Sequence, residues 1–304
     1  MSKGVPRQFL HQVRTRWSFS KLSKGTKYLR VPLFFSCNKS KDLGYAKERI
    51  KARISGWKSK SLSWIGRATL IKSVALSTLI YAMSTLKFPK KLNEEMDALI
   101  RKFWWSPKHD GNWFFTPLAW SNLCKPLSEG GLGFKSFECL NEAMTTKLAW
   151  WVLSSRDSFC VKVLRAKYHV ESQWLSSRPA RAASFSWRGV KSVKHILSKG
   201  ACKIVSLGVN ILVWSDPWIP NLPSFKPSPR DQLSHLPCLP VSQLLNQDRM
   251  HWDLNKHKKL FTEESVKAIL NIPRRCSVSE DKWTWLPTTN GDLLVKSAFK
   301  TIVN

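Results

Sequence analysis

Apolar residues recur at helical spacing along much of the chain, and this pattern limits the possible fold more than any other feature. It is clearest over residues 39–60, where a stripe at 3.6-residue spacing predicts a helix with one buried face. That stripe consists of Leu43, Ala46, Ile50, Ile54 and Trp57. Residues 1–27 lack steady periodicity, so we expect a loop or frayed segment there, and then a short extended run over residues 28–33.

Further helices are predicted downstream of this stripe. Ser63 can cap a helix that runs to about Leu86, and its apolar residues lie nearly all round, which predicts burial between neighbouring elements. Asn93 is expected to cap the next helix, which ends in the aromatic residues 103–105, expected in the core. Two more helices are predicted over residues 138–153 and 160–168.

The second half of the chain mixes helices with short strands. A helix over 187–197 is followed by an expected hairpin of 203–206 with 210–214, and proline residues make 217–229 a loop. A helix capped by Thr262, a hairpin of 282–286 with 292–295 and a last helix over 296–303 complete the pattern. The predicted fold class is therefore mainly α with small β-hairpin units, an α+β arrangement.

The charge balance indicates the class of partner. The chain has 50 Lys and Arg against 20 Asp and Glu, a formal net charge of +30, together with 16 Trp. Such an excess favours polyanions, and phosphate neutralisation supplies most of the affinity of a protein for nucleic acid that does not depend on sequence. We therefore expect RNA or DNA as partner and no small-molecule substrate.

Basic side chains flank the apolar stripe of residues 39–60 on both sides. Lys47, Lys51 and Lys58 lie on one shoulder at 100° per residue, and Arg49, Arg53 and Lys60 lie on the other. One interpretation is two basic rails that contact phosphates. The other is that long basic side chains only cover the edges of a docked helix while their charged ends stay in water.

Residue patterns for catalysis or metal binding are not found in the sequence. There is no adjacent Asp-Asp pair for two-metal chemistry, and His251 and His257 have no Cys pair near them for zinc. The glycine-rich residues 129–134 lack the Gly-Lys-Ser/Thr ending of a phosphate loop, so a structural turn is expected. We expect no catalytic residue, no metal and no cofactor, and thus no enzyme.

Cysteine content and hydropathy bear on the compartment. Seven scattered Cys without a Cys-x-x-Cys pair favour reduced thiols in an intracellular setting. The best apolar run, 73–86, is too short for a bilayer, so no membrane association is expected. The acid-free basic residues 1–41 have the composition of an organellar transit peptide, although a basic chain would also begin in this way. We expect a nuclear location, with an organelle as the alternative.

Several segments, taken in order, resemble plant non-LTR retroelement reverse transcriptases. Residues 28–33 resemble the family's Tyr-Leu-Gly-Val-Pro-Leu, residues 54–63 its Gly-Trp-Lys-x-Lys-x-Leu-Ser, and residues 66–74 its Gly-Arg-x-x-Leu-Ile-x-Ser-Val. The likeness continues through Phe103-Trp-Trp, Gly130-Gly-Leu-Gly, Trp187-Arg-Gly, Trp214-Ser-Asp-Pro-Trp and Val295-Lys-Ser. The resemblance covers about residues 28–304.

The resemblance implies a position in the family's proteins after the polymerase palm. Together with the composition, which sets apart a basic segment (1–41) and a linker rich in Ser, Arg and Ala (171–186), it divides the chain into three further parts. These are a helical thumb-like region (42–170), an α+β connection region (187–279) and the truncated start of a reverse-transcriptase zinc-binding domain (280–304). The palm's acidic motifs have no matching positions, and the zinc ligands would fall after Asn304. No catalytic or metal residue is therefore carried over.

The resulting hypothesis is a truncated retroelement-derived protein that binds nucleic acid backbone without polymerase activity of its own. It would hold a template–primer hybrid through the rails, and a separate palm-containing chain could complement it. The expected contacts are Lys47, Arg49, Lys51, Arg53, Lys58, Lys60, Arg67 and Lys72. Two alternatives stay open: a non-functional gene relic, and an organellar intron-processing or ribonucleoprotein factor.

Overall fold

The computed structural model describes residues 7–17, 22–23, 25–29, 31–58, 61–106, 115–170, 174–175, 177, 183–231, 238–246, 251–273 and 280–303. Helices dominate, and the strands form two small antiparallel two-stranded sheets. This confirms the predicted fold class. None of the helices in these ranges is long and apolar enough to cross a membrane.

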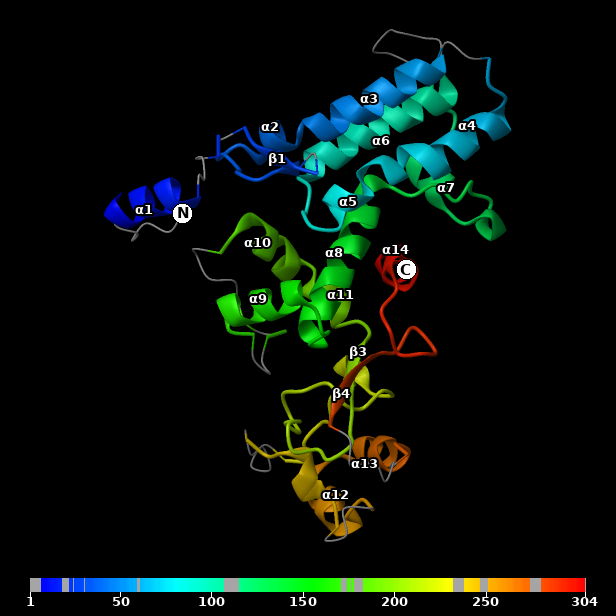
Figure 1. Cartoon of the computed structure of the whole chain (residues 1–304). Coiled ribbons are helices and arrows are strands. Elements are labelled where there is room, and N and C mark those ends of the chain that lie inside the picture. Colours follow the sequence, from blue (N-terminus) through cyan, green and yellow to red (C-terminus); the bar gives the residue numbers. More distant parts are fainter. Residues whose placement is uncertain are drawn as a thin grey trace.

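The helices of the first half lie together in one layer (Figure 1), and their buried side chains form one hydrophobic core. This layer is preceded by α1 (Arg7–Trp17) and the hairpin of β1 (Lys27–Tyr28) with β2 (Val31–Pro32). The layer itself consists of α2 (Lys39–Leu43), α3 (Tyr45–Lys58), α4 (Trp64–Leu70), a π-helix (Ile71–Ala75), a 3₁₀ turn (Ser77–Leu79), α5 (Ile80–Met83) and α6 (Lys90–Trp105).

Helix α8 (Phe137–Leu153) joins this layer to the next core. It follows α7 (Trp120–Cys124) and a 3₁₀ turn (Leu127–Glu129), and Ser136 caps it by accepting a hydrogen bond from the N–H of Cys139 at 3.2 Å. Its first turns pack in the core of the first half, and its last turns pack in a second core. That second core also receives α9 (Phe159–Tyr168), α10 (Phe185–Ser192), α11 (Lys194–Leu197) and α14 (Val295–Val303).

A third core lies beyond the sheet of β3 (Ala201–Ile204) and β4 (Lys282–Trp285). It is built from loops, two 3₁₀ turns (Pro223–Phe225 and Val241–Leu244), α12 (Leu254–Leu260) and α13 (Glu263–Leu270). Trp174 and Ala183, from the predicted linker, are buried in the second core. The proposed domain limits stay predictions.

Several local predictions are confirmed. Ser63 caps α4, because its hydroxyl accepts a hydrogen bond from the N–H of Gly66 at 3.2 Å. Thr262 caps α13 in the same way through Ser265. The structural turn expected at 129–134 is also present. Gly130 follows the 3₁₀ turn Leu127–Glu129 with φ of 76°, in the left-handed region where a glycine avoids a steric penalty.

Other local predictions are wrong. Residues 7–17 form α1 rather than a loop, and the predicted helix over 39–60 is broken at Gly44 into α2 and α3. Asn93 does not cap α6, because the helix already begins at Lys90 after Pro89 and places Asn93 in the core. The segment 63–86 is not buried all round either, since Trp64, Ile65, Ile80 and Tyr81 are exposed.

The two expected hairpins of the second half are replaced by one long-range pairing. β3 pairs with β4, and Cys202 lies opposite Thr284. The carboxylate of Asp281 provides a physical reason, because it accepts hydrogen bonds from the N–H groups of Ser206 at 2.8 Å and Gly208 at 2.9 Å. These N–H groups are therefore not available for a local strand ladder.

Candidate nucleic-acid interface

Helices α3 and α6 lie side by side and run in the same direction (Figure 1). Lys47 near the start of α3 pairs with Glu95 of α6, and Trp57 near the end of α3 packs 5.5 Å from Phe103 of α6, measured between ring centroids. Ala46, Ile50 and Ile54 are buried beneath α3. The predicted apolar stripe therefore holds α3 on the core and leaves its opposite face to solvent.

The predicted basic residues of α3 have different surroundings. Lys51 and Arg53 are exposed and Arg49 is half-buried. Lys47 Nζ lies 2.8 Å from Glu95 Oε2. Both side chains of this pair stay more than one-third accessible, so the ion pair contributes little stability and Lys47 can exchange its partner. The side chain of Lys58 and the whole of Lys60 lie outside the described residues.

Arg67 on α4 is held in place by three contacts. Its Nη1 donates to the main-chain oxygen of Trp104 at 2.9 Å, and its Nε donates to that of Leu62 at 3.3 Å. Its guanidinium lies 4.3 Å from the ring centroid of Trp64. Arg67 therefore joins α4 to the end of α6, a structural role that the predicted phosphate contact did not anticipate.

Lys72 in the π-helix is exposed. Its Nζ lies 6.0 Å from the ring centroid of Phe134, at the outer limit of a cation–π contact. Arg67 and Lys72 thus lie on a different segment from the basic residues of α3. The predicted contact residues within the described ranges are therefore carried by α3, by α4 and by the π-helix.

Trp64 is the residue of interest that the sequence prediction missed. It is half exposed, and its ring packs 4.9 Å from Trp104 and 6.0 Å from Trp105, between centroids. Ile65 beside it is 80% exposed. The spacing of Trp64 and Arg67 by three residues on a helix is the signal that could have identified this pair.

Three titratable groups near α6 and α8 have pKa values that burial raises. Burial raises the pKa of the Asp97 carboxyl to about 7, and burial raises the pKa of the Cys124 thiol to about 12. The pKa of Cys139 is also raised by burial. A protonated thiol is a poor nucleophile and a poor metal ligand. Within the described ranges, no group of three or more His, Cys, Asp or Glu side chains could hold a metal ion.

No protein-family model matches the chain. It is 29% identical over 264 residues to an Arabidopsis thaliana protein named "Putative ribonuclease H protein". The aligned region covers 84% of this chain and 42% of that relative. It is also 28% identical over 144 residues to an Arabidopsis thaliana protein named "Uncharacterized mitochondrial protein". The aligned region covers 46% of this chain and 91% of that relative.

The chain is similar to plant proteins. It spans less than half the length of the first of these relatives. The similarity is compatible with a plant retroelement-derived origin, as the resemblance implied.

Proposed function

We propose that this chain binds the sugar-phosphate backbone of RNA or DNA without reading sequence, through the exposed basic face of α3, with Lys72 and the Trp64–Arg67 pair as a second contact. The observation that carries the proposal is the exposure of Lys51 and Arg53 on a helix whose other face is fixed in the core. The helix that carries these cations is fixed on the core, and contacts between cations and phosphates position a strand without specifying its sequence.

The net charge of the whole chain supports the same proposal and also complicates its test. At +30 the chain will attract any nucleic acid at low salt. Only a comparison of variants with equal charge can therefore assign binding to α3. We also propose, from the resemblance, a retroelement origin of the reverse-transcriptase class. Such an origin would make a template–primer hybrid the natural ligand.

The test is a salt titration with labelled single-stranded RNA, single-stranded DNA and an RNA–DNA hybrid. Lys51→Gln with Arg53→Gln should reduce the slope of log K against log salt by about 0.7 per lost contact on single strands. The matched control is Lys162→Gln with Lys167→Gln, two exposed lysines of α9 that remove the same charge. An equal change in both double variants would assign binding to net charge alone and refute the role of α3.

Absence of polymerase activity is part of the proposal. The purified chain with Mg²⁺ and deoxynucleotides should not extend a primer, and primer extension would overturn this part. One relative is named as a ribonuclease H protein, so the RNA strand of the labelled hybrid should be followed in the same reactions. Cleavage of that strand would replace the binding-only proposal with a nuclease.

A second candidate function is that of an organellar ribonucleoprotein or intron-processing factor. One relative is named as a mitochondrial protein, and residues 1–41 are basic without an acid. This candidate predicts that residues 1–27 carry a fluorescent reporter into mitochondria or plastids. A nuclear or diffuse reporter signal would exclude this organellar candidate.

A further inference from the structure

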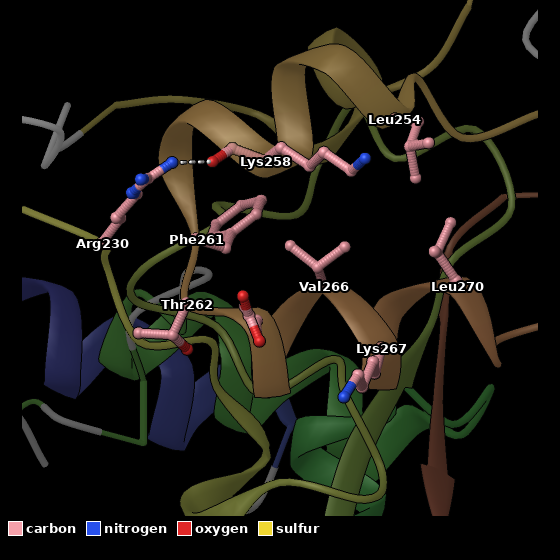
Figure 2. Close-up of a pocket in the computed structure, with 9 residues that line it drawn as sticks. Arg230, Leu254, Lys258, Phe261, Thr262, Val266, Lys267 and Leu270 are labelled. Carbon is pink, nitrogen blue, oxygen red and sulfur yellow. Dashed lines mark hydrogen bonds between the residues drawn. The ribbon is translucent and has the colours of Figure 1, made fainter.

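Helices α12 and α13 diverge from a shared corner and enclose a groove of about 710 Å³ (Figure 2). The corner is formed by Phe261 and Thr262, which join the two helices. Leu254 and Leu270 face each other at the opposite, open end. The lining residues are Arg230, Leu254, Lys258, Phe261, Thr262, Glu263, Val266, Lys267 and Leu270.

The walls of the groove are apolar. Phe261 and Val266 are buried at its floor, whereas Leu254 and Leu270 remain 42% and 43% exposed at its mouth. Two leucines of neighbouring helices therefore remain exposed on either side of one hollow. A hollow with apolar walls and a few polar groups is the usual form of a binding site.

The rim of the groove is positively charged. Arg230, Lys258 and Lys267 line it, and Glu263 is the one carboxylate among the described lining residues. Arg230 is fixed at the corner, because its Nη1 donates to the main-chain oxygen of Lys258 at 3.1 Å. An occupant therefore needs an apolar face flanked by negative charge.

The groove is held open by the packing around it. His257 is fully buried, and its Nε2 lies 3.0 Å from the main-chain oxygen of Leu244, which fixes α12. Arg230 N donates to Leu260 at 2.9 Å and Thr262 N donates to Ser228 at 3.2 Å, which fix the corner. A preformed site of this kind loses little conformational entropy when it is occupied.

We propose that this groove binds an amphipathic helix of a partner protein, with large apolar side chains on one face and Asp or Glu on both sides of that face. Two helices with an apolar hollow between them match the helix-in-groove mode of recognition. Charge complementarity selects the acidic partner. Nucleic acid fits less well, because the aromatic ring at the floor, Phe261, is only 2% exposed and cannot stack on a base.

The test uses a fluorescently labelled helical peptide with leucines at i, i+3, i+4 and i+7 and glutamates beside them. Anisotropy is measured with the full chain at about 150 mM salt, where the Debye length of about 8 Å suppresses general attraction. We expect binding at least about tenfold tighter than that of a scrambled peptide of the same composition. Equal binding of both peptides would overturn the proposal, because it would reflect charge alone.

A charge exchange assigns the site. The double variant Lys258→Glu with Lys267→Glu should bind the glutamate peptide at least about tenfold more weakly than the unmodified chain. It should instead bind a peptide in which lysines replace the glutamates. The control double variant, Lys296→Glu with Lys300→Glu on α14, carries the same net charge and should bind the glutamate peptide like the unmodified chain. Failure of the lysine peptide to bind the first variant while circular dichroism shows it folded would refute the groove.

A second variant separates the apolar contribution from the charge. Leu270→Gln removes the exposed leucine at the mouth of the groove. It should lower the affinity for the glutamate peptide at least about fivefold and leave the salt dependence of that affinity unchanged. Sedimentation equilibrium tests the alternative occupant, a second copy of this chain, because it measures self-association. Self-association that Leu270→Gln abolishes, together with no peptide binding, would assign the groove to a second copy and overturn the proposal.

Discussion

Asp97 on α6 accepts a hydrogen bond from the main-chain N–H of Phe137, the first residue of α8, at 3.1 Å. This contact joins the helical layer of the first half to the helix that passes on to the second core. It does so through a carboxyl whose pKa burial raises from 3.8 to about 7. We therefore expect the stability of this junction to depend on pH.

The protonation of Asp97 should make stability fall as the pH rises from about 4 to about 7. In this window the folded chain keeps a proton that the unfolded chain has released, so the free energy of unfolding decreases with pH. Asp97→Asn keeps the acceptor oxygen and removes the charge, so it should stabilise the chain at pH 8 by about 2–4 kcal/mol and change little at pH 4. Urea unfolding of both proteins at the two pH values measures this. An Asn variant that is less stable at pH 8 would contradict it.

Lys203 and Asp216 form an ion pair in the third core, and breaking one side of it should be costly. Lys203 Nζ lies 2.9 Å from Asp216 Oδ2, and both side chains are only 9% exposed. Asp216→Ala leaves a buried ammonium without its partner, so we expect a loss of about 3–5 kcal/mol. Lys203→Met combined with Asp216→Ala should recover part of it. Thermal unfolding of the three proteins tests this, and a double variant as unstable as Asp216→Ala would argue against the pair.

Asn141 on α8 should be among the least replaceable polar residues of the chain. Its Oδ1 accepts from the N–H of Phe88 at 2.7 Å, and its Nδ2 donates to the oxygens of Met83 and Leu86 at 2.9 and 2.8 Å. Asn141→Leu leaves three buried main-chain groups unpaired and should cost at least about 2 kcal/mol. Asn122→Leu, at an exposed position on α7, should change the free energy of unfolding by less than about 0.5 kcal/mol.

Two glycines should respond in opposite directions to alanine. A Cβ at Gly131 would lie 2.1 Å from the main-chain oxygen of Lys125, so Gly131→Ala should destabilise the chain by at least about 2 kcal/mol. A Cβ at Gly56 in α3 would meet nothing within 4 Å, so Gly56→Ala should stabilise it by about 0.5–1 kcal/mol. Denaturant titrations of both variants measure the pair. A tolerated Gly131→Ala would show that the turn relaxes.

Sequence periodicity predicted the bounds of two helices closely. The helix expected at 138–153 is α8, and the one expected from Thr262 is α13. It failed where a neighbour decided the outcome. Asn93 resembles a cap but is buried inside α6, and the strand at 201–204 found its partner at 282–285.

The candidate interface was predicted as a set of charges, and the structure separates that set. Lys51 and Arg53 are exposed as expected. Arg67 also donates from Nη1 and Nε to the main-chain oxygens of Trp104 and Leu62, and Lys47 pairs with Glu95. A one-dimensional pattern contains the number of cations, but it does not contain their distances to acids and carbonyls from other segments.

The sequence by itself determined the helical class, the positive charge and the buried face of α3, because hydrophobic periodicity and charge are local or summed properties. The tertiary structure alone decided the β3–β4 pairing, the raised pKa of Asp97 and the groove between α12 and α13. These features depend on contacts between residues far apart along the chain, whose desolvation and hydrogen bonds no local pattern records.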